Sequence, residues 1–202
     1  MPVPARVIVV AGPSGSGKSR LSRRLGLPVV NLDDFYKDGD DPTLPSLDLG
    51  GGAPIVDWDS PDSWRREDAL EALERLCADG VADMPLYDIA ASRRTGHRLL
   101  DLTGAQHFVA EGIFAQEVVS ECAHRGLLAD AICVTQHPVV TFVRRLTRDL
   151  REHRKPPMVL VRRGVHLMLQ QRRVVEHAAA AGCRVVHPDT AYTEIRALVA
   201  QS

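Results

Sequence analysis

The stretch AGPSGSGKS at residues 11–19 constrains this chain more than any other. Its glycines at positions 12 and 17, followed by Lys-Ser, fit the pattern G-x-x-x-x-G-K-[ST], in which a curled backbone points successive N–H groups at an anion. The apolar run before it reads as a buried strand and residues 20–25 as a helix, whose N-terminus favours negative charge. The sequence therefore predicts a phosphate-binding loop made of Gly12, Pro13, Ser14, Gly15, Ser16, Gly17, Lys18 and Ser19.

The chemistry served by such a loop needs a held phosphate chain, a placed Mg²⁺, an oriented hydroxyl and neutralised charge. Lys18 is expected to reach the β- and γ-phosphates of ATP, and the Ser19 hydroxyl to ligate Mg²⁺. ATP and Mg²⁺ are therefore the expected cofactors.

Two acids follow apolar runs that read as strands. Asp33 ends the strand expected at 28–32, where it can take the proton of an acceptor hydroxyl and touch Mg²⁺ through water. Asp34 is its rival, and strand alternation predicts that the two carboxylates face opposite ways. Glu111 ends the strand expected at 107–111 and is a candidate Mg²⁺ ligand, direct or through water, and Gly112 permits close backbone approach.

A basic stretch follows the apolar run at 131–135. Its members are Arg144, Arg145, Arg148, Arg151, Arg154 and Lys155. They fit either a solvated helix face with i,i+4 ion pairs or a lid whose guanidinium groups close over a triphosphate. The inner face of the same helix is expected to consist of Val139, Phe142, Val143, Leu146 and Leu150.

Apolar strands alternate with helical periods along the chain. Strands are expected at 7–10, 28–32, 107–111, 131–135 and 184–186, and helices at 20–25, 61–80, 115–125, from 138 to the break at 155–157, at 158–180 and at 190–200. Residues 38–60 read as a loop. The pattern predicts an α/β fold with a central parallel sheet and helices on both faces. One domain over 1–202 would carry a small β-hairpin at about 81–103 and a lid at about 150–158.

Composition excludes several classes of partner. Hydrophobic residues make up 45% of the chain, charged residues 25%, and the net charge is −1, so no basic field recruits nucleic acid or an anionic membrane. We find no apolar run long enough to span a membrane, and we expect no signal peptide. The four cysteines are scattered. We expect a cytoplasmic protein with reduced thiols, three of them in the core.

Six segments together resemble the uridine/cytidine kinase family of P-loop kinases. They are GPSGSGKS at 12–19, LDDFYK at 32–37, DSPDSW at 59–64, PLYD at 85–88, EGI at 111–113 and RRLTRD at 144–149, in family order. The phosphate loop is shared by many families, whereas the other segments are much more specific. The resemblance implies the three-layer P-loop NTPase fold and phosphoryl transfer from ATP.

The resemblance also implies roles for individual residues. Asp33 matches the catalytic acid, and Ser19, Asp33 and Glu111 match the Mg²⁺ environment. Arg145 and Arg148 match arginines near the transferred phosphates, and with Lys18 and Asp33 they form the expected catalytic set. The expected acceptor site comprises Tyr36, Asp59, Tyr87, Ser92 and Arg94, and Arg154 of the lid is expected to contact ATP.

The chain departs from the family at the base pocket and at the lid. Ser92 stands where the family places a pyrimidine-reading His, and the lid reads Glu-His-Arg-Lys at 152–155 instead of Glu-Arg-Gly-Arg. The leading hypothesis is an ATP-dependent kinase of a nucleoside hydroxyl. The alternatives are a kinase of another small hydroxyl compound, such as a sugar or a pantothenate-like molecule, and a nucleotide-binding ATPase switch. The choice between ATP and GTP, and between a monomer and a homo-oligomer, stays open.

Overall fold

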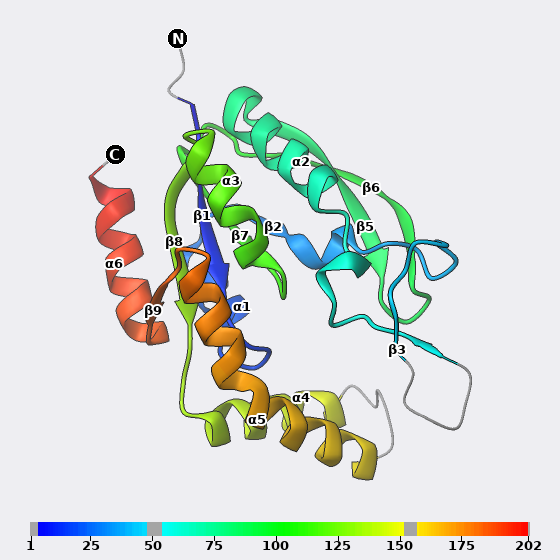
Figure 1. The fold of residues 1–202 in the computed structure, drawn as a ribbon. Coiled ribbons are helices and arrows are strands. Elements are labelled where there is room, and N and C mark those ends of the chain that lie inside the picture. The colour runs from blue at the N-terminus through cyan, green and yellow to red at the C-terminus, as the bar shows by residue number, and fades with distance from the viewer. Residues whose placement is uncertain (1–3, 48–53, 152–156, 202) are drawn as a thin grey trace.

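A computed structural model describes residues 4–47, 54–151 and 157–201 (Figure 1). Its centre is a five-stranded sheet in the order β2-β7-β1-β8-β9, and every neighbouring pair is parallel. The strands are β1 (Arg6–Ala11), β2 (Val29–Asn31), β7 (His107–Glu111), β8 (Leu128–Val134) and β9 (Arg184–Val186). The predicted parallel sheet is confirmed, with all five expected strands.

Helices cover both faces of this sheet, as the sequence predicts. They are α1 (Lys18–Leu25), α2 (Arg66–Asp79), α3 (Val119–His124), α4 (Pro138–Arg151), α5 (Pro157–Ala180) and α6 (Pro188–Ala200). Alternate residues of β1 point to opposite faces: Val7 and Val9 pack with α2, α3 and α5, whereas Ile8 and Val10 pack with α1 and α6. This is a three-layer α/β arrangement.

Two antiparallel pairs stand beside the sheet. β5 (Val81–Asp88) and β6 (Arg93–Asp101) form the predicted hairpin, with the turn at 89–92. β3 (Ser46–Leu47) pairs with β4 (Ile55–Val56), so the expectation that 38–60 is only a loop was wrong. The segment 48–53 between them lies outside the described residues.

The helix expected at 61–80 is divided into two parts. Ser60 caps a short 3₁₀ turn, η2 (Pro61–Ser63), by accepting a hydrogen bond from the Asp62 N–H, and α2 begins only at residue 66. Gly80 ends α2 in the left-handed conformation, as predicted. The remaining 3₁₀ turns are η1 (Leu32–Phe35) and η3 (Ala115–Val118), and η3 forms the first part of the helix expected at 115–125.

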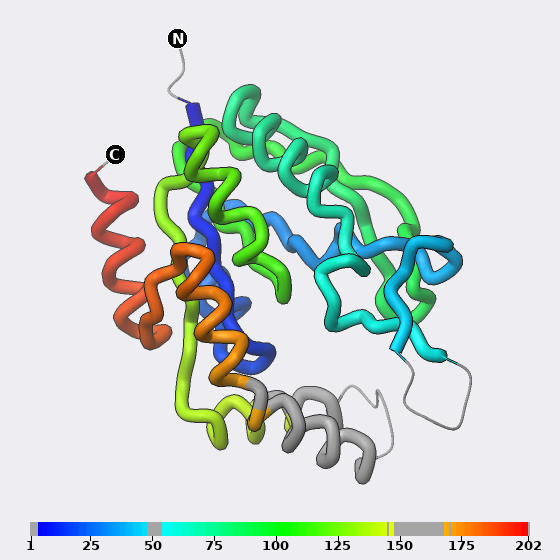
Figure 2. Tube along the Cα trace, in the orientation of Figure 1, coloured from blue at the N-terminus to red at the C-terminus, as the bar shows by residue number. Residues whose placement is uncertain are grey.

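The expected inner face of α4 is wrong at two positions. Val139 and Val143 are each 51% exposed, while Thr141 is buried. The reason is that α4 packs mainly against α5 and lies beyond the carboxyl end of the sheet (Figure 2). The predicted lid residues 152–156 lie outside the described part of the chain.

All four cysteines are buried and free, so the prediction of three core thiols falls one short. Among the described helices, none is both long and apolar enough to cross a membrane.

Candidate active site

The phosphate loop joins β1 to α1, in the context that the sequence predicts. Gly12 has φ +133°, and a Cβ there would overlap the carbonyl oxygen of Val134 in β8. Gly17 has φ +107° and is the N-cap of α1. Side chains larger than hydrogen are thus excluded where the loop passes the neighbouring strand, and the N-terminus of α1 opens onto the loop.

Lys18 lies across the mouth of this loop. Its Nζ donates to the carbonyl oxygens of Gly12 at 2.6 Å and Pro13 at 3.2 Å. The ammonium group is therefore held where the loop curls.

Asp33 belongs to η1 and not to a strand, because β2 ends at Asn31. The Asn31 side chain caps η1 by accepting a hydrogen bond from the Asp33 N–H at 3.3 Å. The Asp33 Oδ1 atom accepts from the Ile113 N–H at 2.8 Å, and a Cβ at Gly112 would lie only 2.8 Å from this oxygen. Gly112 thus permits the contact that orients the Asp33 carboxylate.

Asp34 points elsewhere, but not by strand alternation. The Asp34 Oδ1 atom accepts from the Asn31 Nδ2 at 3.0 Å, and the carboxylate also bonds the backbone of Tyr87 in the hairpin. Burial raises the pKa of Asp34, against the opposing influence of Arg98. This acid links η1 to β5, which is a structural position.

Glu111 ends β7 next to the loop. Burial raises its pKa, while a hydrogen bond with Ser19 and the charge of Lys18 lower it. Its Oε2 atom is buried and has no hydrogen-bond partner. A buried carboxylate oxygen without a partner, beside a hydroxyl and near Asp33, fits the oxygen donor set of Mg²⁺.

Within residues 4–47, 54–151 and 157–201, no group of three or more His, Cys, Asp or Glu side chains could hold a metal ion.

An aromatic cluster contains two of the predicted acceptor residues. The ring of Tyr36 lies 5.7–5.9 Å from the rings of Trp58, Tyr87 and Phe114. The Tyr36 hydroxyl donates to the Trp58 carbonyl at 3.1 Å, and the Tyr87 hydroxyl to the Lys37 carbonyl at 2.9 Å. The cluster joins η1, the β4–η2 connection and the hairpin.

Of the other three predicted acceptor residues, Arg94 pairs with Tyr87 across the hairpin and Ser92 lies in its turn. Asp59 is exposed in the turn after β4. Ser92 adopts φ +49° in the hairpin turn, and its carbonyl accepts from the Gly39 N–H at 2.6 Å. Arg94 forms an ion pair of 3.6 Å with Asp68 of α2.

The predicted catalytic arginines lie in α4. The side chains of Arg145 and Arg148 lie outside what the structure describes, as does Arg154 entirely. Arg144 is described, and its Nη1 would lie 3.8 Å from a Cβ placed on Gly17. An arginine of the basic stretch therefore reaches the loop, and the choice between a lid and a solvated face stays a prediction for its neighbours.

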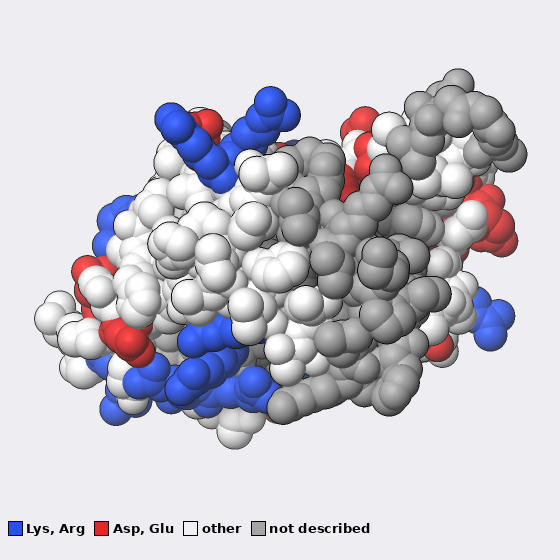
Figure 3. All heavy atoms as spheres, turned by 90° about the horizontal axis from the view of Figure 1, so that it is seen from below, with Lys and Arg blue, Asp and Glu red and all other residues white. Residues whose placement is uncertain are grey.

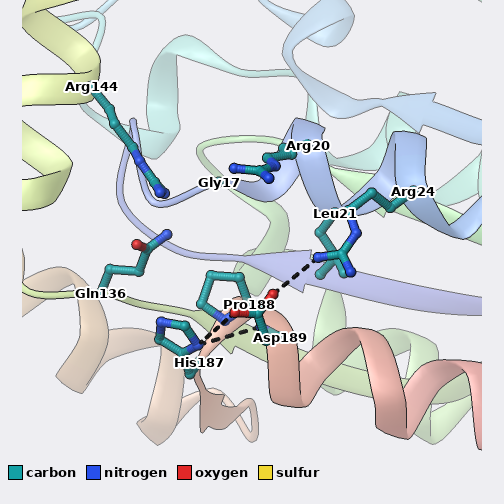
Figure 4. A pocket seen from close by; sticks show the side chains of 9 residues that line it. All are labelled: Gly17, Arg20, Leu21, Arg24, Gln136, Arg144, His187, Pro188 and Asp189. Atoms are coloured by element: carbon teal, nitrogen blue, oxygen red, sulfur yellow. Dashed lines mark hydrogen bonds and ion pairs between the residues drawn. The ribbon is translucent and has the colours of Figure 1, made fainter.

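Sequence reasoning missed a pocket of about 100 Å³ beside the loop (Figure 4). The pocket is lined by Arg20 and Arg24 of α1, by Gln136 and Arg144, and by residues 187–189. Lys and Arg side chains gather on one part of this end of the molecule (Figure 3). The sequence could have indicated this pocket only through the positions of its residues. Gln136 follows β8 and residues 187–189 follow β9, at the carboxyl end of the sheet where parallel sheets bind ligands.

One ion pair closes the floor of this pocket. The Arg24 Nη1 atom lies 3.0 Å from the Asp189 Oδ1, and the Arg24 guanidinium covers the Tyr192 ring at 4.2 Å. Arg24 is thereby committed to α6, and the His187 Nδ1 also contacts Asp189, 3.7 Å from its Oδ2 atom. Arg20 and Arg144 are left to face a ligand.

Comparison with known proteins assigns the family. No protein-family model matches the chain. A uridine kinase from Deinococcus deserti is 32% identical over 161 residues, 75% of this chain and 72% of that protein. A uridine kinase from Lactobacillus johnsonii is 26% identical over 154 residues, 72% of this chain and 68% of the relative.

The fold has a counterpart among solved structures. A candidate fructose transport system kinase from Silicibacter sp. superposes with a TM-score of 0.61 at 18% identity, over 92% of this chain and 88% of that one. The phosphate loop, the parallel sheet and the similarity to the uridine kinase from Deinococcus deserti all indicate the same family. The chain belongs to the uridine kinase family and is a small-molecule kinase with a P-loop fold.

Proposed function

We propose that this kinase transfers the γ-phosphoryl group of ATP to a hydroxyl of a nucleoside. One observation carries the proposal: Asp33 is oriented by the Ile113 N–H at 2.8 Å and lies close enough to Glu111 to influence its pKa, as does Lys18 of the phosphate loop. A base, a metal-binding acid and a phosphate-binding cation thus gather at adjacent strand ends. Phosphoryl transfer to an alcohol requires this set.

The residues divide the work as follows. The loop amides and Lys18 hold the phosphates, and Ser19, Glu111 and Asp33 are the groups that would hold Mg²⁺. Mg²⁺, when bound, neutralises charge on the β- and γ-phosphates. Asp33 orients the acceptor hydroxyl and takes its proton. Arg144, Arg145 and Arg148 balance charge on the transferred group.

The donor's nucleoside part is assigned to the pocket lined by Arg20, Arg144 and His187, because Gly17 of the phosphate loop lies on its wall. ATP is the donor that we propose.

A nucleoside acceptor is supported by the relatives named uridine kinase and by the aromatic rings of Tyr36 and Tyr87 on the hairpin side of Asp33. A second candidate is another small alcohol, and Ser92 favours it. The Ser92 carbonyl accepts a hydrogen bond from the Gly39 N–H, and a Cβ on Gly39 would lie 3.2 Å from the Ser92 Cβ, so the hairpin turn packs against Gly39. A serine at this position offers no imidazole to a pyrimidine.

An ADP-release assay with Mg²⁺ tests the proposal against a panel of nucleosides, sugars and pantothenate-like alcohols. Release that depends on uridine or cytidine supports a nucleoside kinase. Release that depends only on another alcohol identifies the second candidate. Slow release that no alcohol accelerates, and that Asp33→Asn leaves unchanged, would mark a nucleotide switch and contradict the proposal.

A further inference from the structure

Two glutamines lie in series between the phosphate loop and α5. The Gln136 Nε2 atom donates to the Ser16 carbonyl at 2.6 Å. The Gln171 Nε2 atom, on α5, donates to the Gln136 carbonyl at 2.7 Å and to the Thr135 Oγ1 at 3.4 Å. Neither glutamine belongs to a sequence motif or to the residues given a role above in phosphoryl transfer.

The bond from Gln136 fixes one peptide plane of the loop. In a trans peptide the C=O and the following N–H point in opposite directions. Because the Ser16 carbonyl points at Gln136, the Gly17 N–H points away from it, on the side where a curled loop presents its amides to phosphate. Ser16 is fully buried, so no water replaces this donor if it is lost.

Gly17 leaves room for this contact. A Cβ at Gly17 would lie 3.3 Å from the Gln136 Nε2, tighter than an ordinary van der Waals contact. The outer side of the loop is therefore occupied by the Gln136 amide, with Arg144 beside it, and the loop cannot turn its carbonyl inward without breaking the bond.

Gln171 in turn fixes the segment that carries Gln136. It is 4% exposed, and its Oε1 atom is buried without a partner. An unpaired buried oxygen opposes folding, and an apolar side chain would avoid that cost. The position is thus occupied by an amide whose donors are both used on the segment 135–136.

We propose that Gln136 and Gln171 are positioning residues that hold the phosphate loop in its anion-binding shape. This inference rests on the proposed function, because it assumes that a nucleotide's phosphates bind this loop. It adds that α5 supports the loop from outside through two side-chain amides.

The test measures MgADP binding by calorimetry, and the KM values for ATP and for the acceptor found in the panel. Gln136→Glu keeps the size but replaces the donor by a carboxylate, and Gln136→Met removes the donor without adding charge. We expect both to weaken MgADP binding and to raise the KM for ATP by roughly tenfold, the scale of one lost hydrogen bond. The KM for the acceptor should stay within about twofold.

Gln171→Glu should produce a smaller change of the same sign. The double variant Gln136→Met/Gln171→Glu should bind MgADP no worse than Gln136→Met alone, because both side chains act through the hydrogen bond from Gln136 to the Ser16 carbonyl. Gln106→Glu is the matched control. It introduces the same charge at an exposed residue before β7, at the end of the sheet opposite to the phosphate loop, and should change none of these values.

Two results would overturn the inference. One is MgADP affinity unchanged in both Gln136→Glu and Gln136→Met. The other is a loss of thermal stability in Gln171→Glu with nucleotide affinity unaltered. If the unmodified protein itself fails to bind MgADP, the failure belongs to the proposed function.

Discussion

At the scale of single residues, the two neighbouring acids of η1 separate into two tasks. Asp33 is oriented toward β7 by the Ile113 N–H, while Asp34 is bonded to Asn31 and to the backbone of Tyr87. A one-residue difference in sequence therefore places one carboxylate at the reaction centre that we propose and the other in the seam with the hairpin.

Asp33→Asn should lower turnover by about 10²-fold or more, because it removes the base while keeping the size of the side chain. MgADP affinity should change little, since the loop and Lys18 hold the phosphates. Asp34→Asn should retain most of its turnover. Steady-state kinetics and calorimetry on both variants provide the check, and an inactive Asp34→Asn beside an active Asp33→Asn would contradict the assignment.

Glu111→Gln should lower turnover at least tenfold and raise the Mg²⁺ concentration needed for half-maximal rate. Thermal stability without Mg²⁺ should not fall, because the buried, unpaired Oε2 of the ionised side chain opposes folding. A Mg²⁺ titration of activity together with thermal unfolding tests this. Loss of stability with an unchanged Mg²⁺ requirement would make Glu111 a structural acid only.

At the scale of secondary-structure elements, the site depends on how β7 meets η1. Gly112 follows β7 directly, and a Cβ there would lie 2.8 Å from both the Asp33 Oδ1 and the Leu32 Cβ. Asp33 and Ile113 are 80 positions apart in the chain, and their elements approach more closely than any side chain at position 112 would allow.

Gly112→Ala should therefore displace η1 and cost turnover by about tenfold or more, with a loss of stability of about 1–3 kcal/mol from overpacking. Kinetics and chemical denaturation measure the two effects. Gly96→Ala is a suitable control, because nothing lies within 4 Å of a Cβ at that strand position. Wild-type turnover in Gly112→Ala would show that Asp33 does not need this close approach.

The first residue of β7 makes stability depend on pH. Burial lowers the pKa of His107, with Arg6 adding to the effect. Below the ordinary pKa of about 6.5 the unfolded chain binds a proton that the folded chain resists, so the stability is complete above that pH and is lost as pH falls. His107→Phe should flatten this loss between pH 7 and 5, whereas exposed His124→Gln should not. Denaturation curves across that range provide the measurement.

At the scale of the whole molecule, four free thiols report the integrity of the core on the face of the sheet that α2, α3 and α5 cover. Burial raises the pKa of Cys77 and Cys133 to about 11 and of Cys122 and Cys183 to about 12. At neutral pH they are protonated and enclosed, which suppresses reaction with thiol reagents.

Labelling with a thiol reagent at pH 7 should be slow in the folded protein. In denaturant, all four thiols should react promptly. Because the reaction requires opening of the core, added MgADP should slow it further through linkage of binding to folding. Rapid labelling of one thiol in the native protein would show that its surroundings open locally, against the enclosed core described above.

The sequence by itself determined the elements whose signals are contiguous. These elements are the phosphate loop with its glycine pattern, the strands β1, β7, β8 and β9 with their apolar runs, and the helix end at Gly80. In each of them the residues that signal the structure lie within a few positions of it. The predicted hairpin followed for the same reason. Local backbone preference and strand burial leave few alternatives at these positions, so the sheet and its loop could be predicted before any contact was known.

The tertiary structure decided what depends on contacts between distant segments. Asn31 ended β2 early by capping η1, packing against α5 left Val139 and Val143 in solvent, and two glutamines outside any motif met the loop. The pocket beside Gly17 needs α1, α4 and the turn before α6 together. Such features carry no local signature, because each residue's environment is supplied by parts of the chain that only folding brings to it.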